Sequence, residues 1–143
     1  MEFIKFPILI RSCWFGLNYL FREKISSCPI TTVQYTVLRT LFEAHNKKLN
    51  QKELASLIAT NKNNSSSIVK RLEVLKYIVH IPNPEDKREN IIKITAQGEK
   101  VFLLVNQKAL ELQDVLTNKF SKQELIELSG YMTRINGKLP TKI

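Results

Sequence analysis

The chain has 143 residues and a formal net charge of +9, from 22 Lys and Arg against 13 Asp and Glu. This length lets one domain bury a core without disulfides or metal ions, and a composition that is 43% hydrophobic and 24% charged excludes a disordered chain. The sequence pI near 9.7 favours an anionic partner, either nucleic acid or an anionic lipid surface.

The cysteine content and the N-terminal stretch indicate where the protein resides. Cys13 and Cys28 fit neither a metal-ligand spacing nor a disulfide framework, so we expect a reducing, cytoplasmic compartment. The apolar N-terminal stretch is interrupted by Lys5, Pro7 and Arg11, and no uninterrupted apolar run reaches the ~18 residues of a membrane span. We therefore expect no signal peptide, no membrane anchor and no membrane partner.

The first predicted helix covers residues 8–24, and Pro7 is well placed in its first turn. A surface helix needs one apolar stripe, but the apolar residues here cover more than one face. They are Leu9, Ile10, Cys13, Trp14, Phe15, Leu17, Leu20 and Phe21. This pattern predicts a helix that is buried in a subunit interface.

Two further helices follow. Thr31 or Thr32 caps the first of them, and a short polar link over residues 45–49 leads to a capping box from Asn50 to Glu53 that opens the second. The expected buried positions are Val33, Thr36, Val37, Leu41 and Ala44 in the first helix and Leu54, Ala55, Leu57 and Ile58 in the second.

A helix and a hairpin come next. Residues 59–64 are predicted to form a turn and the start of a helix that runs to about Lys76. Its inward-facing residues recur at helical spacing and are Ile68, Val69, Leu72 and Leu75. The period then changes, and two strands over residues 78–82 and 90–94 flank a turn-rich charged tip.

Two long helices complete the chain. Thr95 caps a helix predicted to reach about residue 118, and Ser121 with Glu124 forms a capping box for a last helix that reaches Leu139. The predicted fold is mainly α with a small β-hairpin wing (α+β). It is a winged helix-turn-helix with additional N- and C-terminal helices.

The helix before the hairpin starts with seven residues, 61–67, none of which is apolar. In a helix-turn-helix this part of the second helix faces the base edges of the major groove, where Asn pairs with adenine. The alternative is a solvated cap, because Asn and Ser favour caps and turns. Seven such residues in succession within this topology favour a DNA-binding face, with Lys62, Lys70 and Arg71 reaching phosphates.

The hairpin tip supplies a second set of candidate contacts. Lys87 and Arg88 suit the minor groove, and Asp86 is placed to orient Arg88 through a charge-assisted pair. The alternative is a solvated charged turn. The predicted DNA-binding residues are Gln51, Lys62, Asn63, Asn64, Ser66, Ser67, Lys70, Arg71, Asp86, Lys87 and Arg88.

Several linked segments resemble the MarR family of regulators. They are TVQYTVL at 32–38, NQKELA at 50–55, IVKRLE at 68–73, DKR at 86–88 and ITAQG at 94–98. The resemblance implies a triangular homodimer that binds double-stranded DNA at a pseudo-palindromic operator and regulates transcription, as a repressor. It implies one MarR-like domain over 1–143, with dimerisation helices at about 7–25 and 96–139 and a winged-helix DNA-binding lobe at about 31–95.

Three positions depart from the family pattern. Lys76 stands where the family usually ends the reading helix with Gly, a residue that readily adopts the left-handed conformation. His80 replaces an Arg that is common at the start of the wing, and Ser65 stands where a small apolar residue is usual.

The family resemblance also implies a small-molecule effector, a small aromatic anion held between the dimer region and the DNA-binding lobe. The candidate wall residues are Trp14, Tyr19, Tyr35 and Arg39, although aromatic residues at helical spacing also serve as core. A thiol-switched regulator is an alternative. Alignment places Pro7 rather than Cys13 near the position of the sensing Cys, and Cys13 lies among apolar residues, so we expect Cys28 to be the more exposed thiol.

Two readings from other classes remain. A winged-helix protein-interaction module would keep the hairpin but would not need a polar helix start beside Lys and Arg. An enzyme is not expected, nor a cofactor or metal, because His45 and His80 are accompanied by no nucleophile–base pattern, phosphate loop or ligand cluster.

Overall fold

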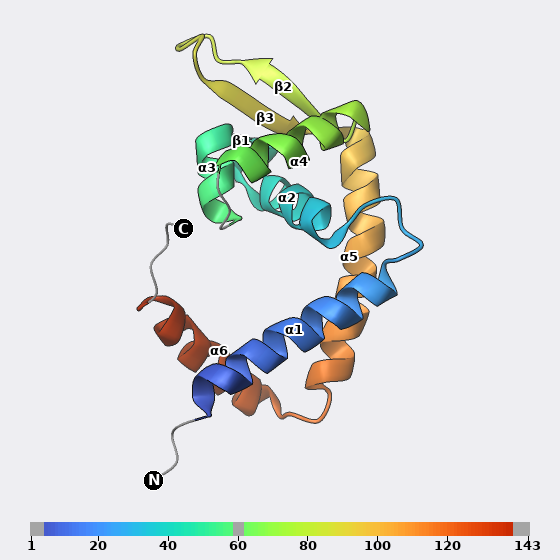
Figure 1. Cartoon of the computed structure of the whole chain (residues 1–143), viewed down its shortest axis with the longest axis vertical. Helices are drawn as coiled ribbons and strands as arrows, with labels where there is room; N and C mark the ends of the chain where they lie inside the picture. Colours follow the sequence, from blue (N-terminus) through green and yellow to red (C-terminus); the bar gives the residue numbers. More distant parts are fainter. Residues whose placement is uncertain (1–4, 59–61, 139–143) are drawn as a thin grey trace.

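The computed structural model describes residues 5–58 and 62–138, and the fold is mainly helical with one small sheet (Figure 1). Its helices are α1 (Phe6–Lys24), α2 (Thr32–Glu43), α3 (Gln51–Leu57), α4 (Lys62–Val74), α5 (Ala96–Thr117) and α6 (Lys122–Asn136), with a 3-10 turn at His45–Lys47. Its strands are β1 (Lys48–Asn50), β2 (Ile78–Pro82) and β3 (Asn90–Ile94). The predicted mainly α fold with a β wing is confirmed.

The helix starts follow from local hydrogen bonds. The side chains of Thr31, Asn50 and Ser121 each accept a bond from a backbone N–H three residues on and form full capping boxes. Thr95 caps α5 by accepting a bond from the backbone N–H of Gly98. The predicted caps are thereby confirmed, with Thr31 rather than Thr32 as the cap of α2.

The sheet has the strand order β1-β3-β2, and both pairs are antiparallel. Strand β1 corrects the expected polar link over 45–49, because its three residues pair with the distant β3 and place Leu49 opposite Ile92. Asn46 and Lys47 turn the chain into β1 with positive φ angles of 54° and 55°. Such a short strand exists only through tertiary pairing, so no local pattern announces it.

The core lies in the upper lobe of Figure 1, where α2, α3, α4, the sheet and the first half of α5 meet. Predicted positions that are buried include Val37, Leu41, Leu54, Val69 and Leu72. Two predicted core residues are wrong, since Val33 is 49% and Leu57 is 64% exposed. Tyr35 and Leu38 fill the inner face of α2 instead, because α2 packs on α5, where the Tyr35 ring stacks on Phe102 at 5.7 Å between centroids.

Helix α5 runs from this lobe to the opposite end of the molecule, where it meets α1 (Figure 1). Helices α1 and α6 bury none of their residues within this chain. The exposed large apolar residues there are Phe6, Ile8, Leu9, Trp14, Phe15, Leu17, Tyr19 and Leu20 of α1 and Phe120, Ile126, Leu128, Tyr131 and Met132 in and before α6. An apolar surface of this extent is typical of a subunit interface. Among the described helices, none has the length and apolarity that crossing a membrane requires.

Candidate nucleic-acid interface

Helix α4 turns one face to the core and the other to solvent. Ser65, Val69 and Leu72 are buried, and the exposed face carries polar and basic side chains. The predicted contacts on that face are Asn64, Ser67, Lys70 and Arg71. The backbones of Lys62 and Asn63 belong to the first turn of α4, but their side chains lie outside the described residues. Of the polar side chains described at the start of α4, Asn64 and Ser67 are thus presented outward, as a groove-reading helix requires, whereas Ser65 faces the core.

Gln51 and Ser66 join α3 to α4. The Gln51 side-chain Nε2 donates a hydrogen bond to the Ser66 Oγ over 2.8 Å, and both residues are half-buried. Gln51 and Ser66 were both predicted to contact DNA. In the structure the two side chains bond to each other, and this bond fixes the start of α4 against α3.

The end of α4 shows why a departure from the family pattern is tolerated. Lys76 adopts the left-handed conformation with φ 64°, and the Tyr77 N–H donates to the Leu72 carbonyl over 3.0 Å. This is the Schellman arrangement, which Gly usually completes. His80 of β2 then lies with its Nδ1 2.9 Å from Glu73 Oε1, so the side chain that replaces Arg connects the hairpin to α4.

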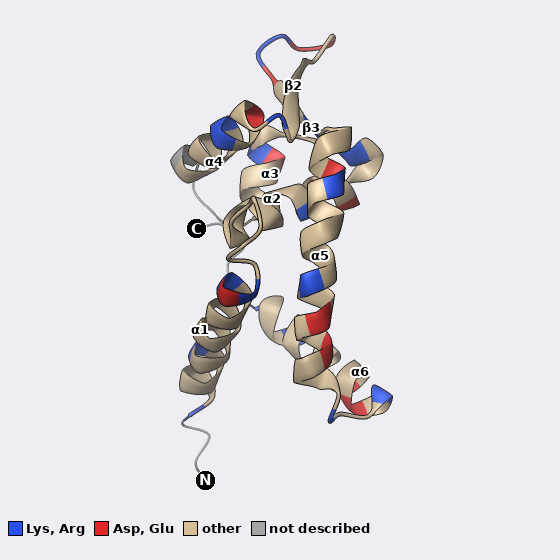
Figure 2. Ribbon diagram, turned by 90° about the vertical axis from the view of Figure 1, so that its right-hand side faces the viewer, with Lys and Arg blue, Asp and Glu red and all other residues tan. Residues whose placement is uncertain are grey.

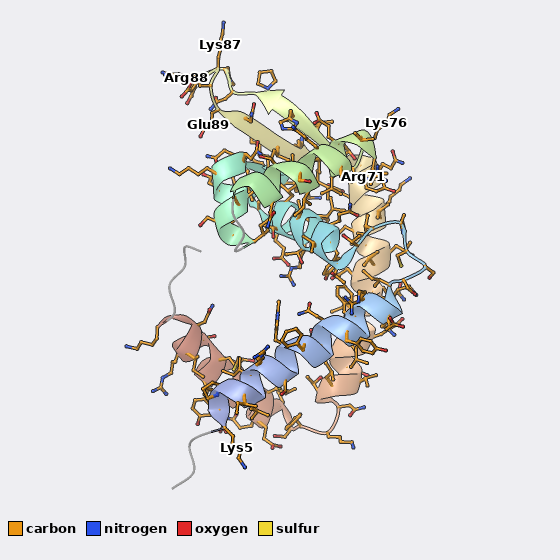
Figure 3. All side chains as sticks on the ribbon, in the orientation of Figure 1. Lys5, Arg71, Lys76, Lys87, Arg88 and Glu89 are labelled. Atoms are coloured by element: carbon orange, nitrogen blue, oxygen red, sulfur yellow. The ribbon has the colours of Figure 1, made fainter. Side chains whose placement is uncertain are left out.

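The wing, residues 78–94, extends beyond α4 and carries Lys87 and Arg88 at its tip (Figures 2 and 3). The Arg88 side chain is 96% exposed, and its Nε lies 3.7 Å from Asp86 Oδ1. The same Asp86 oxygen accepts the Arg88 backbone N–H over 2.9 Å. The predicted pairing of Asp86 with Arg88 is present, and Lys87 is exposed beside it.

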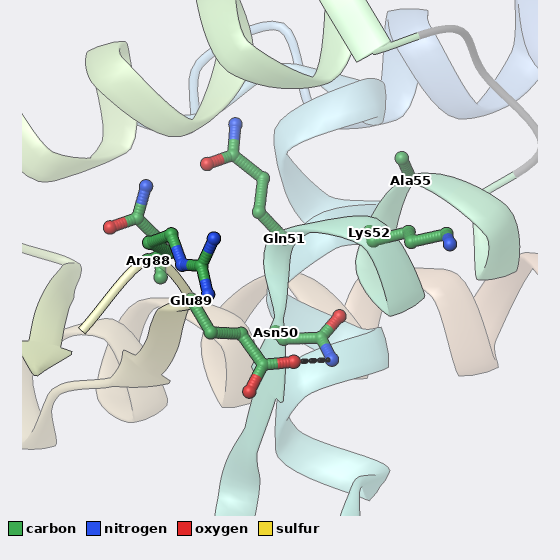
Figure 4. A pocket seen from close by; sticks show the side chains of 7 residues that line it. Asn50, Gln51, Lys52, Ala55, Arg88 and Glu89 are labelled. Atoms are coloured by element: carbon green, nitrogen blue, oxygen red, sulfur yellow. Dashed lines mark hydrogen bonds between the residues drawn. The ribbon is translucent and has the colours of Figure 1, made fainter. Parts of the chain in front are cut away.

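Glu89, at the base of the wing tip, was not among the predicted site residues. Its Oε1 accepts a hydrogen bond from Asn50 Nδ2 over 2.8 Å, and its Oε2 accepts one from Asn83 Nδ2 over 2.7 Å. Asn50 and Glu89 both line a hollow of about 540 Å³ between α3 and the wing (Figure 4). No local signal could reveal their bond, because Asn50 and Glu89 are 39 residues apart in the chain.

A second hollow of about 790 Å³ lies between α1, α2 and α5. Of the four predicted effector-site residues, Trp14, Tyr35 and Arg39 line it, and Tyr19 does not. Tyr35 is only 5% exposed, and its hydroxyl donates to Asn106 Oδ1 over 2.9 Å. Burial raises the pKa of Tyr35 above 10.0, with Arg39 acting in the opposite direction. The hollow therefore offers an aromatic wall, a neutral phenol and one cation, Arg39, together with the carboxylate of Glu43.

The exposure of the two thiols differs from the expectation that Cys28 is the more exposed. Cys13 is exposed and Cys28 is half-buried, the reverse of the predicted order. The apolar neighbours of Cys13 do not cover it within one chain, because α1 has a free outer surface, whereas Cys28 packs against the core of the lobe. Among the described residues, no three His, Cys, Asp or Glu side chains gather as metal ligands would.

Residues 29–89 match the model of the MarR family. FarR of Neisseria gonorrhoeae, an HTH-type transcriptional regulator, is 24% identical over 115 residues, which cover 80% of this chain and 77% of FarR. The crystal structure of a MarR mutant from E. coli complexed with operator DNA has a TM-score of 0.83 at 24% identity and covers 97% of this chain and 96% of its own. NadR in complex with 4-hydroxyphenylacetate has a TM-score of 0.79 at 23% identity, with 93% and 92% covered.

These matches agree with the fold described above. The matched segment contains α2, α3, α4 and the tip of the wing, and the likeness to solved structures extends over the remaining helices as well. Residues 29–89 are thus similar to the MarR family, and the chain as a whole has the winged-helix fold of the solved MarR structures.

Proposed function

We propose that this protein is a cytoplasmic, sequence-specific DNA-binding regulator, a repressor, that acts as a homodimer on a pseudo-palindromic operator and is not an enzyme. The observation that carries the proposal is that one lobe exposes both the basic wing tip and a polar and basic face of α4, made of Asn64, Ser67, Lys70 and Arg71. The operator complex of the E. coli relative supports it. A protein-interaction module would have no use for this combination.

Within the interface, the contacts divide into two tasks. Asn64 and Ser67 on the outer face of α4 read base edges, together with Asn63, and Gln51 holds Ser66 at the groove. The basic side chains Lys62, Lys70, Arg71 and Lys87 neutralise phosphates, and Arg88, oriented by Asp86, enters the minor groove.

Dimerisation uses the apolar surface of α1, α6 and the second half of α5. The single domain of 1–143 thus comprises dimerisation helices at about 7–25 and 96–139 and a winged-helix lobe at about 31–95. Leu17→Lys on α1 places a charge in this surface and should convert the dimer to monomers, whereas Lys100→Glu in the exposed first turns of α5 should not. Sedimentation equilibrium distinguishes the two, and a monomeric wild type contradicts the proposal.

The effector is a small aromatic anion bound in the 790 Å³ hollow, where Arg39 pairs with its charge and Trp14 and Tyr35 contact its ring. The 4-hydroxyphenylacetate complex of NadR supports this chemistry. Titration with hydroxylated aromatic carboxylates should quench Trp14 fluorescence, and Arg39→Gln should weaken binding about tenfold, the loss of one charge-assisted hydrogen bond. Equal affinity of the variant would place the effector elsewhere.

The decisive experiment selects genomic fragments with purified protein and measures affinity against salt. Phosphate-driven binding should fall steeply as salt rises. Arg88→Ala should weaken binding and erode the preference for AT-rich flanks, whereas Asn64→Ala or Ser67→Ala should relax choice at particular bases by about 1–3 kcal/mol each. Uniform weakening over all sequences would contradict this division of tasks. A thiol switch would instead make DNA binding depend on peroxide, and Cys13→Ser or Cys28→Ser would abolish that dependence.

A further inference from the structure

Both strands of the wing meet one carboxylate where the tip begins. Asn83 follows β2 and Glu89 precedes β3, and Glu89 holds Asn83 with one oxygen and Asn50 of the α3 N-cap with the other. We propose that Glu89 is a positioning residue of the DNA interface. It fixes the wing relative to the reading helix, so that the wing is already ordered when Arg88 reaches the minor groove. The inference rests on the proposed function.

Asn50, the residue of α3 in this Glu89 clamp (Asn50, Asn83 and Glu89), is itself held in place by two hydrogen bonds. Asn50 Oδ1 accepts the Glu53 N–H over 2.7 Å, and the Asn50 N–H donates to Glu53 Oε2 over 3.1 Å. A capping box that is closed in both directions leaves the Asn50 side chain little freedom, and its Nδ2 is directed at Glu89 (Figure 4). The clamp therefore connects the wing to a helix end rather than to a mobile loop.

Side-chain bonds connect the wing to the helices at its middle and at the base of its tip. Among the residues that the structure describes, His80 with Glu73 joins the middle of β2 to α4, and Glu89 with Asn50 joins the start of β3 to α3. Beyond Glu89 the tip is exposed, and Arg88 has Asp86 of the same tip as its ion-pair partner. Loss of the clamp would leave the distal wing to pivot on the sheet, and binding would then have to supply the ordering entropy.

The sign of the effect separates positioning from simple electrostatics. A carboxylate near DNA repels phosphates, so removing one should strengthen binding if charge alone mattered. Glu89→Ala is expected to weaken binding roughly 10-fold, because the wing is no longer ordered in advance. Glu85→Ala removes the same charge from the same tip and is the matched control, which should bind as tightly as wild type or more tightly.

A swap of the two interacting groups provides a rescue. Asn50→Asp keeps a good helix cap but sets two carboxylates against each other, so it should weaken binding. Adding Glu89→Gln to that variant lets the introduced amide donate to the introduced carboxylate and accept from Asn83, at the wild-type net charge. This double variant should recover to within about threefold of wild type.

The assay is fluorescence anisotropy with a selected operator and with a duplex whose flanks are shuffled, after thermal unfolding has confirmed that each variant folds. The loss in Glu89→Ala should disappear on shuffled flanks and in an Arg88→Ala background, which a general structural defect would not reproduce. If wild type binds no duplex, the proposed function falls and this inference with it. If wild type binds and Glu89→Ala behaves like Glu85→Ala, or the swap fails to rescue, only the inference is overturned.

Discussion

Three consecutive serines in α4 occupy three different environments, which makes Ser65 a sharp test of the structure. Ser65 is fully buried, and its Oγ has no hydrogen-bond partner. Ser66 accepts a bond from Gln51, and Ser67 is exposed. All three lie in the same helix, so their intrinsic helix propensities are alike and their environments alone separate the effects of substitution by Ala.

Ser65→Ala should stabilise the protein by about 1–3 kcal/mol, because it removes a buried hydroxyl that gave up its bonds to water and gained none. Ser67→Ala should gain at most roughly 0.5 kcal/mol, from helix propensity alone. Ser66→Ala should be neutral or lose about 1 kcal/mol, because the same propensity gain is offset by loss of the bond from Gln51.

Urea unfolding of all four proteins at one fixed concentration measures the differences, since a dimer's midpoint depends on concentration. The expected order of stability is Ser65→Ala, then Ser67→Ala, then wild type and Ser66→Ala. A Ser65→Ala protein no more stable than Ser67→Ala would refute the reasoning, because it would mean that the Ser65 hydroxyl is satisfied. The DNA affinity of Ser65→Ala should match that of wild type, since Ser65 faces inward.

Two substitutions and one pH dependence test three further features of the fold. Lys76→Gly should stabilise the protein by about 1 kcal/mol, measured by urea unfolding, because Gly adopts the observed positive φ without a Cβ clash; a lower midpoint would contradict the left-handed assignment. Gly98→Ala should destabilise by roughly 1–3 kcal/mol in the same assay, since a Cβ there would meet the Tyr77 carbonyl oxygen; an unchanged midpoint would mean that α5 sits farther from Tyr77. The raised pKa of Tyr35 favours the neutral phenol in the folded state, so the stability that the phenol contributes is present below pH 10 and is lost as pH rises through the raised pKa. The difference in unfolding free energy between wild type and Tyr35→Phe should therefore shrink over that range. A difference that does not depend on pH would refute this reasoning.

Much of the local structure could be predicted from the sequence because its causes are local. The caps at Thr31, Asn50, Thr95 and Ser121 are bonds between residues three apart, and a pattern of side chains records them directly. The hairpin strands were predicted at the observed bounds, since a change from helical to alternating periodicity is also local.

The burial of particular faces was less predictable. Val33 and Leu57 are as apolar as their buried neighbours, yet they remain exposed, because the side of a helix that is covered depends on which helix packs there. In α2 that side is set by the stacking of Tyr35 on Phe102 of α5, a contact between distant parts of the chain.

The sequence by itself determined the order of the helices and the hairpin, the polar residues that open α4 and the charged wing tip, since each depends on residues within a few positions of one another. Only the tertiary structure decided that β1 exists, that Gln51 braces Ser66 and that Glu89 joins the wing to α3. Those features are pairings between residues far apart in the chain, and a hydrogen bond across such a separation forms only after the hydrophobic core has brought its partners together.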